Sequence, residues 1–235
     1  MNLNEIMQQL QQSGHESIKK VLVKHGAREP FFGVKVEDLK KIAKKVKTDY
    51  ALSLELYNTG NSDAMYLAGL IADPIKMTRE ELNDWAEKAY WYYLSEFTVP
   101  WVTSESRYGV ELALLWIDSD KENIASAGWA TLASIAAVKE DDEIDATLYH
   151  QLLARVSKTI HSEKNRVRHT MNNFVIAVGG YCRHLSSDAL KVASTLGKVH
   201  VDMGGTACKV PDATEYIQKM HKRNLLGKKR KSARC

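Results

Sequence analysis

The sequence predicts an all-α fold, and three observations support this prediction. Apolar residues recur with the 3.6-residue period of a helix along nearly the whole chain. Glycine and proline, which interrupt helices, account for only 13 and 4 of the 235 residues. The expected helices are short and are joined by short polar breaks, which is typical of an α-solenoid of stacked HEAT-like helix pairs. No strand-like alternation and no nucleotide-binding glycine motif occurs, so the alternative architecture is an irregular helical bundle.

The individual helices follow from apolar spacing and from N-terminal caps. Apolar residues at i, i+3, i+4 and i+7 define a helix over residues 36–46. Asp49 and Ser62 are the expected N-caps of the next two helices, and Thr78 with Glu81 forms a capping-box pattern. We therefore expect helices over residues 7–22 with an interruption near Gly14, 36–46, 50–57, 63–72, 78–93, 107–118, 122–138, 145–161, 164–179, 187–199 and 213–224.

Positive charge is concentrated at the C-terminus. Residues 219–235 contain eight of the 33 Lys and Arg residues and none of the 29 Asp and Glu residues, which leaves 25 basic against 29 acidic residues in 1–218. A basic end on a helical body suggests an anionic polymer as partner. Because residues 227–235 contain no apolar anchor, we expect a disordered basic tail that follows a single domain of residues 1–226.

Other features exclude several classes of protein. No apolar run of 18 residues and no signal-peptide pattern is present, so we expect a cytoplasmic protein without a membrane partner. Cys182, Cys208 and Cys235 are too far apart for a disulfide framework or a zinc motif and fit free thiols. The eight histidines are scattered and support no catalytic triad. We expect no metal and no cofactor.

Three stretches carry a resemblance to a known family. They are FFGVKVEDLKKIA at 31–43, NRVRHTMNNFVIAVGGY at 165–181 and VDMGGTACKVP at 201–211. Over most of its length the chain resembles the DNA alkylation repair family, which includes the AlkD-type alkylpurine DNA glycosylases. The last two stretches resemble a sub-branch rather than the glycosylase type. The resemblance implies a C-shaped helical solenoid whose concave, basic face holds duplex DNA.

The resemblance also implies a candidate catalytic pair. Glycosylase members place an aromatic residue and a carboxylate four residues apart on one helix face, where the carboxylate stabilises positive charge on the sugar of a cationic alkylpurine. Trp101 and Glu105 have this spacing, with Glu in place of the family's Asp. The structural alternative is that Trp101 packs in the core and that Glu105 caps its helix or pairs with Arg107.

Two further family positions differ in this chain. The expected Arg falls near residues 125–129, where only small residues precede Trp129 and fit a close helix–helix contact. The expected second Trp falls near Asn172, Asn173 and Phe174. These departures weigh against glycosylase activity.

Basic and amide side chains in the last third of the chain are candidates for contact with DNA phosphates. Backbone contacts of this kind supply most sequence-independent DNA affinity, although a solvated helix face is the alternative explanation. The candidates are Lys158, Lys164, Arg166, Arg168, Asn172, Asn173, Arg183 and Lys209.

The sequence therefore predicts a DNA-binding protein of this family that grips damaged, distorted or branched DNA through its phosphates. Its expected partner is double-stranded DNA that is alkylated, distorted or branched. Two alternatives remain. One is an active DNA glycosylase that excises cationic alkylpurines such as 3-methyladenine and 7-methylguanine. The other is a HEAT-repeat scaffold for protein interactions.

Overall fold

The computed structural model describes residues 1–234, and within them it contains thirteen α-helices and no strand beyond an isolated bridge between Gly14 and Val34. The helices are α1 (Leu3–Gln12), α2 (Glu16–Lys24), α3 (Val36–Val46), α4 (Tyr50–Asn58), α5 (Ser62–Ile71), α6 (Arg79–Lys88), α7 (Val99–Ser104), α8 (Gly109–Trp116), α9 (Glu122–Val138), α10 (Ala146–Thr159), α11 (Asn165–Tyr181), α12 (Ser186–Leu196) and α13 (Ala213–Lys222). No helix within residues 1–234 is both long and apolar enough to span a bilayer.

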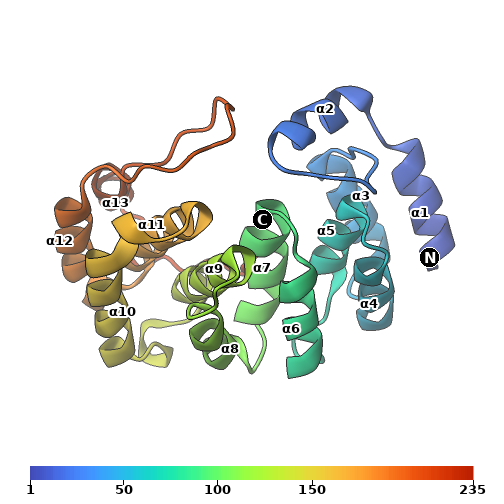
Figure 1. Cartoon of the computed structure of the whole chain (residues 1–235). Coiled ribbons are helices and arrows are strands. Elements are labelled where there is room, and N and C mark those ends of the chain that lie inside the picture. The colour runs from blue at the N-terminus through green and yellow to red at the C-terminus, as the bar shows by residue number, and fades with distance from the viewer. Residues whose placement is uncertain (235) are drawn as a thin grey trace.

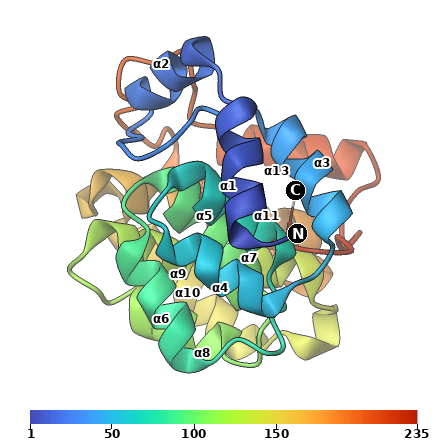
Figure 2. The same ribbon diagram turned by 90° about the vertical axis from the view of Figure 1, so that its right-hand side faces the viewer.

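The helices stack in two rows that curve into an arch (Figure 1). The outer row is α4, α6, α8, α10 and α12, and the inner row is α5, α7, α9 and α11. Helix α2 and the loop of residues 197–212 rise above the two ends of the inner row and approach each other, as both views show (Figures 1 and 2). The predicted C-shaped solenoid of HEAT-like pairs is confirmed, and its inner row forms the floor of a concave groove.

Two hydrophobic clusters make up the core, one in each half of the arch. The N-terminal cluster includes Trp85, which stacks on Tyr57 with ring centroids 4.0 Å apart. The C-terminal cluster is built around Trp129 and Phe174, whose rings meet edge to face at 5.3 Å. Helices α8 and α9 pack closely at Gly128, where an added Cβ would lie 2.8 Å from the Ala113 carbonyl oxygen. The small residues before Trp129 thus serve the predicted close helix contact.

Most predicted helices have their expected bounds within a few residues, and helices 36–46 and 122–138 match at both ends. The break near Gly14 and the cap at Asp49 are also present. Ser62 is the first residue of α5 rather than its cap, because the Asn61 side chain accepts hydrogen bonds from the N–H groups of Asp63 and Ala64.

The predicted helix over residues 78–93 is too long, since α6 ends at Lys88. The four consecutive aromatic residues 90–93 would point in all directions from one helical turn. Most of their apolar surface would then face water. The chain instead leaves the helix, and the rings find separate partners. Trp91 donates to the Ser62 hydroxyl at 3.0 Å, and Tyr90 donates to the Arg28 carbonyl at 3.0 Å.

Residues 227–234 do not form the expected disordered tail. They run along the C-terminal ends of the four inner helices in the order α11, α9, α7 and α5. The bonds along this segment join Gly227 N to Gly180 O (3.0 Å), Arg230 N to Ala137 O (2.8 Å), Ala233 N to Glu105 Oε1 (2.6 Å), Arg234 Nη1 to Leu70 O (3.1 Å) and Arg234 Nη2 to Ala72 O (2.8 Å).

Helix carbonyls explain why this basic segment is held without a large apolar anchor. The last carbonyls of a helix lack intrahelical donors, and they carry partial negative charge that attracts N–H groups and cations. Lys229 donates to the Ala136 carbonyl at 3.1 Å and forms an ion pair with Asp141 at 2.9 Å. Burial lowers the pKa of the Arg234 guanidinium, which is enclosed by the ends of α5. The only buried apolar side chain of the segment is the small Ala233.

Candidate nucleic-acid interface

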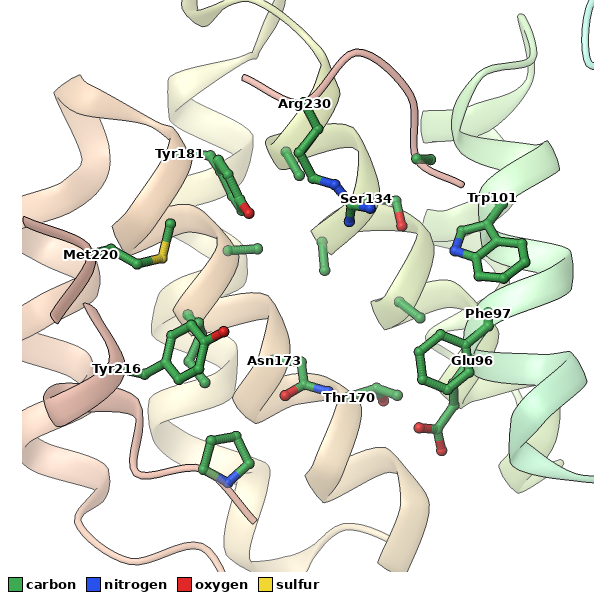
Figure 3. Close-up of a pocket in the computed structure, with 17 residues that line it drawn as sticks. Glu96, Phe97, Trp101, Ser134, Thr170, Asn173, Tyr181, Tyr216, Met220 and Arg230 are labelled. Carbon is green, nitrogen blue, oxygen red and sulfur yellow. The ribbon is translucent and has the colours of Figure 1, made fainter. Parts of the chain in front are cut away.

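A cavity of about 300 Å³ lies in the middle of the concave groove. Its walls come from α7, α9, α11 and α13 together with the tail segment 227–234, as the close-up shows (Figure 3). Trp101 and Phe97 stand on one side, and Tyr181, Tyr216 and Met220 stand on the other. The groove therefore contains a built hollow rather than a smooth surface.

A single π-helical turn positions the residues on the first side. Residues Leu94–Thr98 form a π-helix that leads directly into α7, where Pro100 cannot donate a backbone hydrogen bond. The turn is held close to α5, since an added Cβ on Gly69 would lie 2.6 Å from the Thr98 methyl carbon. This turn places Glu96 and Phe97 on the groove side, where both line the cavity.

Glu96 provides the carboxylate at the edge of the cavity, and both of its oxygens accept hydrogen bonds. Its side chain is 3% exposed, and its two oxygens accept from Arg166 Nε and Nη2 at 2.6 Å each. His169 Nδ1 lies 3.0 Å from the second oxygen. The Arg166 guanidinium also stacks 4.3 Å above the ring of Tyr92, and burial raises the pKa of that phenol to about 12. This cluster joins the N-terminal half of the arch to α11.

Of the two members of the predicted catalytic pair, only Trp101 lines the cavity. Trp101 is 3% exposed and lines the cavity. Glu105 lies one residue beyond the end of α7, where it is the C-cap. Its carboxylate accepts from the Ser232 hydroxyl at 2.8 Å and from the Ala233 N–H, and Ala233 rather than Glu105 faces the cavity. The Glu105 carboxylate is therefore engaged by the tail and does not line the cavity beside Trp101.

The predicted phosphate contacts of α10 and α11 fall into different surroundings. Lys158 is exposed on the outer-row helix α10, away from the groove floor. Lys164 is the N-cap of α11 and donates to the Asp120 carbonyl. Arg166 is held by Glu96. Arg168 is half-buried, and its Nε has no hydrogen-bond partner among the described residues.

The remaining four candidates also lie in different surroundings: one is buried, one lines the cavity and two are exposed. Asn172 is buried, and its amide donates to the Pro211 carbonyl at 2.9 Å, so it anchors the loop before α13 and does not reach a phosphate. Asn173 lines the cavity. Arg183 is exposed beside the tail, whose Gly227 packs against its side chain. Lys209 is exposed in the loop of residues 197–212.

The ends of the arch meet above the groove. The Tyr92 hydroxyl lies 2.7 Å from His25 Nδ1, just after α2. In the opposite loop, an added Cβ on Gly204 would lie 3.1 Å from the Lys24 carbonyl oxygen. A small hollow lined by Lys24, Tyr92, Arg166 and Gly204 lies at this junction. The loop 197–212 thus touches α2 instead of extending into solvent.

Sequence reasoning missed most of the residues that line the cavity, including its two charged residues, Glu96 and Arg230. Neither has a spacing signal, because Glu96 lies in a π-turn and Arg230 reaches the cavity through the tail. The one local sign was Pro100, which marks an irregular helix start shortly after an aromatic run.

The architecture and the groove define a HEAT-like helical-repeat protein. Residues 6–217 match the family model described as DNA alkylation repair enzyme, and the chain belongs to this family. Two uncharacterized proteins, Lin0241 of Listeria innocua and Lmo0209 of Listeria monocytogenes, are each 33% identical over 229 residues, covering 95% of this chain and 99% of the relative.

A solved structure is similar over 100% of both chains, with 38% identity and a TM-score of 0.92. It is described as representing a new family of proteins related to the HEAT-like repeat DNA glycosylases with affinity for branched DNA structures.

Proposed function

We propose that this protein binds branched or otherwise distorted DNA in its concave groove, through backbone phosphates and without excising a base. The similar solved structure, described as having affinity for branched DNA, supports this proposal. So does the distribution of paired and unpaired charge, which is the observation that carries it.

Most cations on the outer-row helices are neutralised in pairs. Within residues 1–234 these pairs are Arg79 with Glu111, Lys88 with Asp84, Arg155 with Asp118 and Lys191 with Asp188, at 2.6–2.9 Å. Lys158 on α10 is the exception among the described residues of these helices. On α2, α13 and the segments 197–212 and 227–234, Lys19 and Lys229 form ion pairs. Most other cations there have no carboxylate within ion-pair distance among the described residues, including Lys20, Lys24, Lys209, Lys219, Lys222, Arg223, Lys228, Arg230 and Lys231. Unneutralised charge on the groove side fits an anionic backbone there.

Lys219 and Arg223 are well placed among these cations. Both line a hollow on α13 that shares Tyr181, Tyr216 and Met220 with the central cavity. They therefore border the same part of the groove, and they offer a test that leaves the Glu96 cluster intact.

The binding test compares a four-way junction with a linear duplex of the same sequence over a series of salt concentrations. Replacing Lys219 and Arg223 by Ala should weaken binding to both DNAs and lower the salt slope by about 0.9 for each lost phosphate contact. The matched control replaces two outer-row cations, Lys88 and Arg79 on α6, and should change neither quantity. Equal effects of the two double variants would show that the concave side is not the DNA face. Absence of binding to any DNA would favour the protein-scaffold alternative.

The non-catalytic part of the proposal rests on the two engaged carboxylates. A carboxylate that stabilises a cationic sugar must be free to face it, but Glu96 is paired with Arg166 and Glu105 is bonded to the tail. We expect no release of 7-methylguanine or 3-methyladenine in a base-release assay on alkylated duplex. Release by the wild-type protein that is lost in Glu105→Gln would overturn this part and establish the glycosylase alternative.

A further inference from the structure

The central cavity exists because its floor is built from small side chains. Helix α9 contributes Ala130, Ala133, Ser134 and Ala137, and α11 adds Ala177. Larger residues at these positions would fill the space between the two aromatic sides. The floor therefore leaves an open space, called the slot here, with Trp101 and Phe97 on one side and Tyr181 and Tyr216 on the other (Figure 3).

The cavity also contains an unused hydrogen-bond donor. Trp101 is 3% exposed, and its Nε1 points into the cavity (Figure 3). This N–H group has no hydrogen-bond partner among residues 1–234. Because it opens to the cavity and is not sealed in the core, it is available to a ligand that carries an acceptor atom.

Other polar groups around the slot are similarly available. The hydroxyls of Ser134, Tyr181 and Tyr216 make no hydrogen bond within the described residues. Asn173 faces the cavity, and within residues 1–234 the one hydrogen bond of its side chain is a long one of 3.4 Å to His169 Nδ1. The slot thus offers both donors and acceptors between aromatic faces.

We propose that this cavity receives a single unpaired nucleobase from the DNA strand bound in the groove. The inference rests on the proposed function and specifies which part of a branched or distorted DNA the groove recognises. A base is flat enough to lie between the two aromatic sides, and its ring nitrogens and carbonyl oxygens supply the acceptor that Trp101 lacks. Ser134 and Asn173 would bond the edge of the base.

Size and charge distinguish a base from other parts of DNA. A volume of about 300 Å³ is at the lower limit of small-molecule pockets, so the cavity fits one planar ring system and excludes a base pair. A phosphate would need convergent cations, but Arg230 is the only Lys or Arg among the described lining residues, and the Glu96 carboxylate also lies at the edge. Phosphates therefore fit the surrounding cations, and the base fits the cavity.

The experiment uses three DNAs that differ at one position: a fully paired duplex, the same duplex with one bulged adenine, and the same duplex with a bulged abasic site. Wild-type protein should bind the bulged adenine about tenfold more tightly than the abasic bulge, because stacking one base on aromatic side chains contributes about that much affinity. A bulged 2-aminopurine should change its fluorescence on binding as its ring leaves the DNA stack.

Two variants test the cavity itself. Ala133→Leu fills the floor and should reduce the preference for the bulged base to about one, while leaving the affinity for a paired junction unchanged. Trp101→Phe keeps an aromatic side but removes the donor and should reduce the preference severalfold. Ala154→Leu, at an exposed position of α10, is the matched control and should retain the full preference. If Ala133→Leu fails to fold, Ser134→Leu blocks the same space.

Three results would overturn the inference. The first is that wild-type protein binds the bulged adenine and the abasic bulge equally well while it still binds a fully paired junction. That result would leave the proposed function standing, whereas no DNA binding at all would remove both. The second is an undiminished preference in the variants that fill the floor. The third is displacement of the 2-aminopurine signal by free deoxynucleoside monophosphate, which would assign the cavity to a free nucleotide.

Discussion

The N-terminal half of the arch contains two buried carboxylates, Asp63 and Glu96, and they are stabilised differently. In the N-terminal half, Asp63 accepts three backbone N–H groups, from Phe32 at 2.6 Å, Gly33 at 3.0 Å and Val34 at 3.1 Å. Glu96, where the halves meet, is held by a guanidinium and an imidazole from α11.

The difference shows what each carboxylate does. Asp63 binds a loop that lies about 30 residues away in its own half, and burial raises its pKa despite the three donors. Glu96 binds a residue 70 positions away in the other half, through a charge pair at the edge of the cavity. The first carboxylate stabilises one half, and the second fixes the two halves relative to each other.

Breaking the Glu96 pair should have the largest effect. Arg166→Ala leaves a carboxylate that is 3% exposed without its main partner, and we expect a loss of about 3–5 kcal/mol in the free energy of unfolding. Denaturant unfolding measures this value. Lys88→Ala breaks a solvent-exposed pair with Asp84 as the control and should cost less than about 1 kcal/mol. Similar losses in both variants would mean that Glu96 does not depend on Arg166.

Removing the other carboxylate should cost somewhat less and should act locally. Asp63→Ala leaves three N–H groups of the loop at 32–34 without an acceptor, which should cost about 3 kcal/mol. Hydrogen exchange should show faster opening of α2 and α3 than of α11. Uniform acceleration along the chain would contradict a role confined to the N-terminal half.

Deleting residues 227–235 should have a smaller effect. The deletion removes hydrogen bonds from the C-terminal ends of four inner helices, although water replaces most of them, so we expect a loss of about 1–2 kcal/mol. Thermal unfolding of the shortened chain measures it. An unchanged melting temperature would indicate that the tail does not rest on the inner row in solution.

The smallest expected effect is the response of the tail to pH. Burial alone would raise the pKa of Asp141, but the bond from Lys229, the Arg183 N–H and the nearby charge of Lys229 together lower it. The stabilisation from Asp141 is therefore complete above its ordinary pKa and is lost as pH falls through the lowered value. Hydrogen exchange of residues 227–234, followed from about pH 5 to pH 3, should show the tail detaching. Asp141→Asn should remove the transition.

The helices were predictable because their signals are local. The apolar spacing of α3 and the run of small residues in α9 are signals within each helix itself, and both helices have the predicted bounds. Glu96 was not predictable, because its environment depends on a π-turn and on residues 70 positions away. Glu105 has the expected spacing from Trp101 but lies at a helix end, where the tail is its nearest source of donors.

The tail was misjudged for a related reason. Its composition contains many charges and few apolar groups, which is typical of disordered segments. Composition does not reveal that four helix ends lie in one row, with carbonyls spaced to receive the cations and N–H groups of a single extended segment. That arrangement exists only in the folded arch.

The path of the tail also affects how this protein unfolds. Repeat solenoids usually gain stability only from adjacent repeats, so their ends can open while the middle stays folded. Here Arg234 bonds the carbonyls of Leu70 and Ala72, at sequence separations of 164 and 162 residues. Opening either end of the inner row must therefore release a segment that spans the whole row. We expect the full-length chain to unfold in one cooperative transition, whereas a chain without the tail should fray repeat by repeat from its ends.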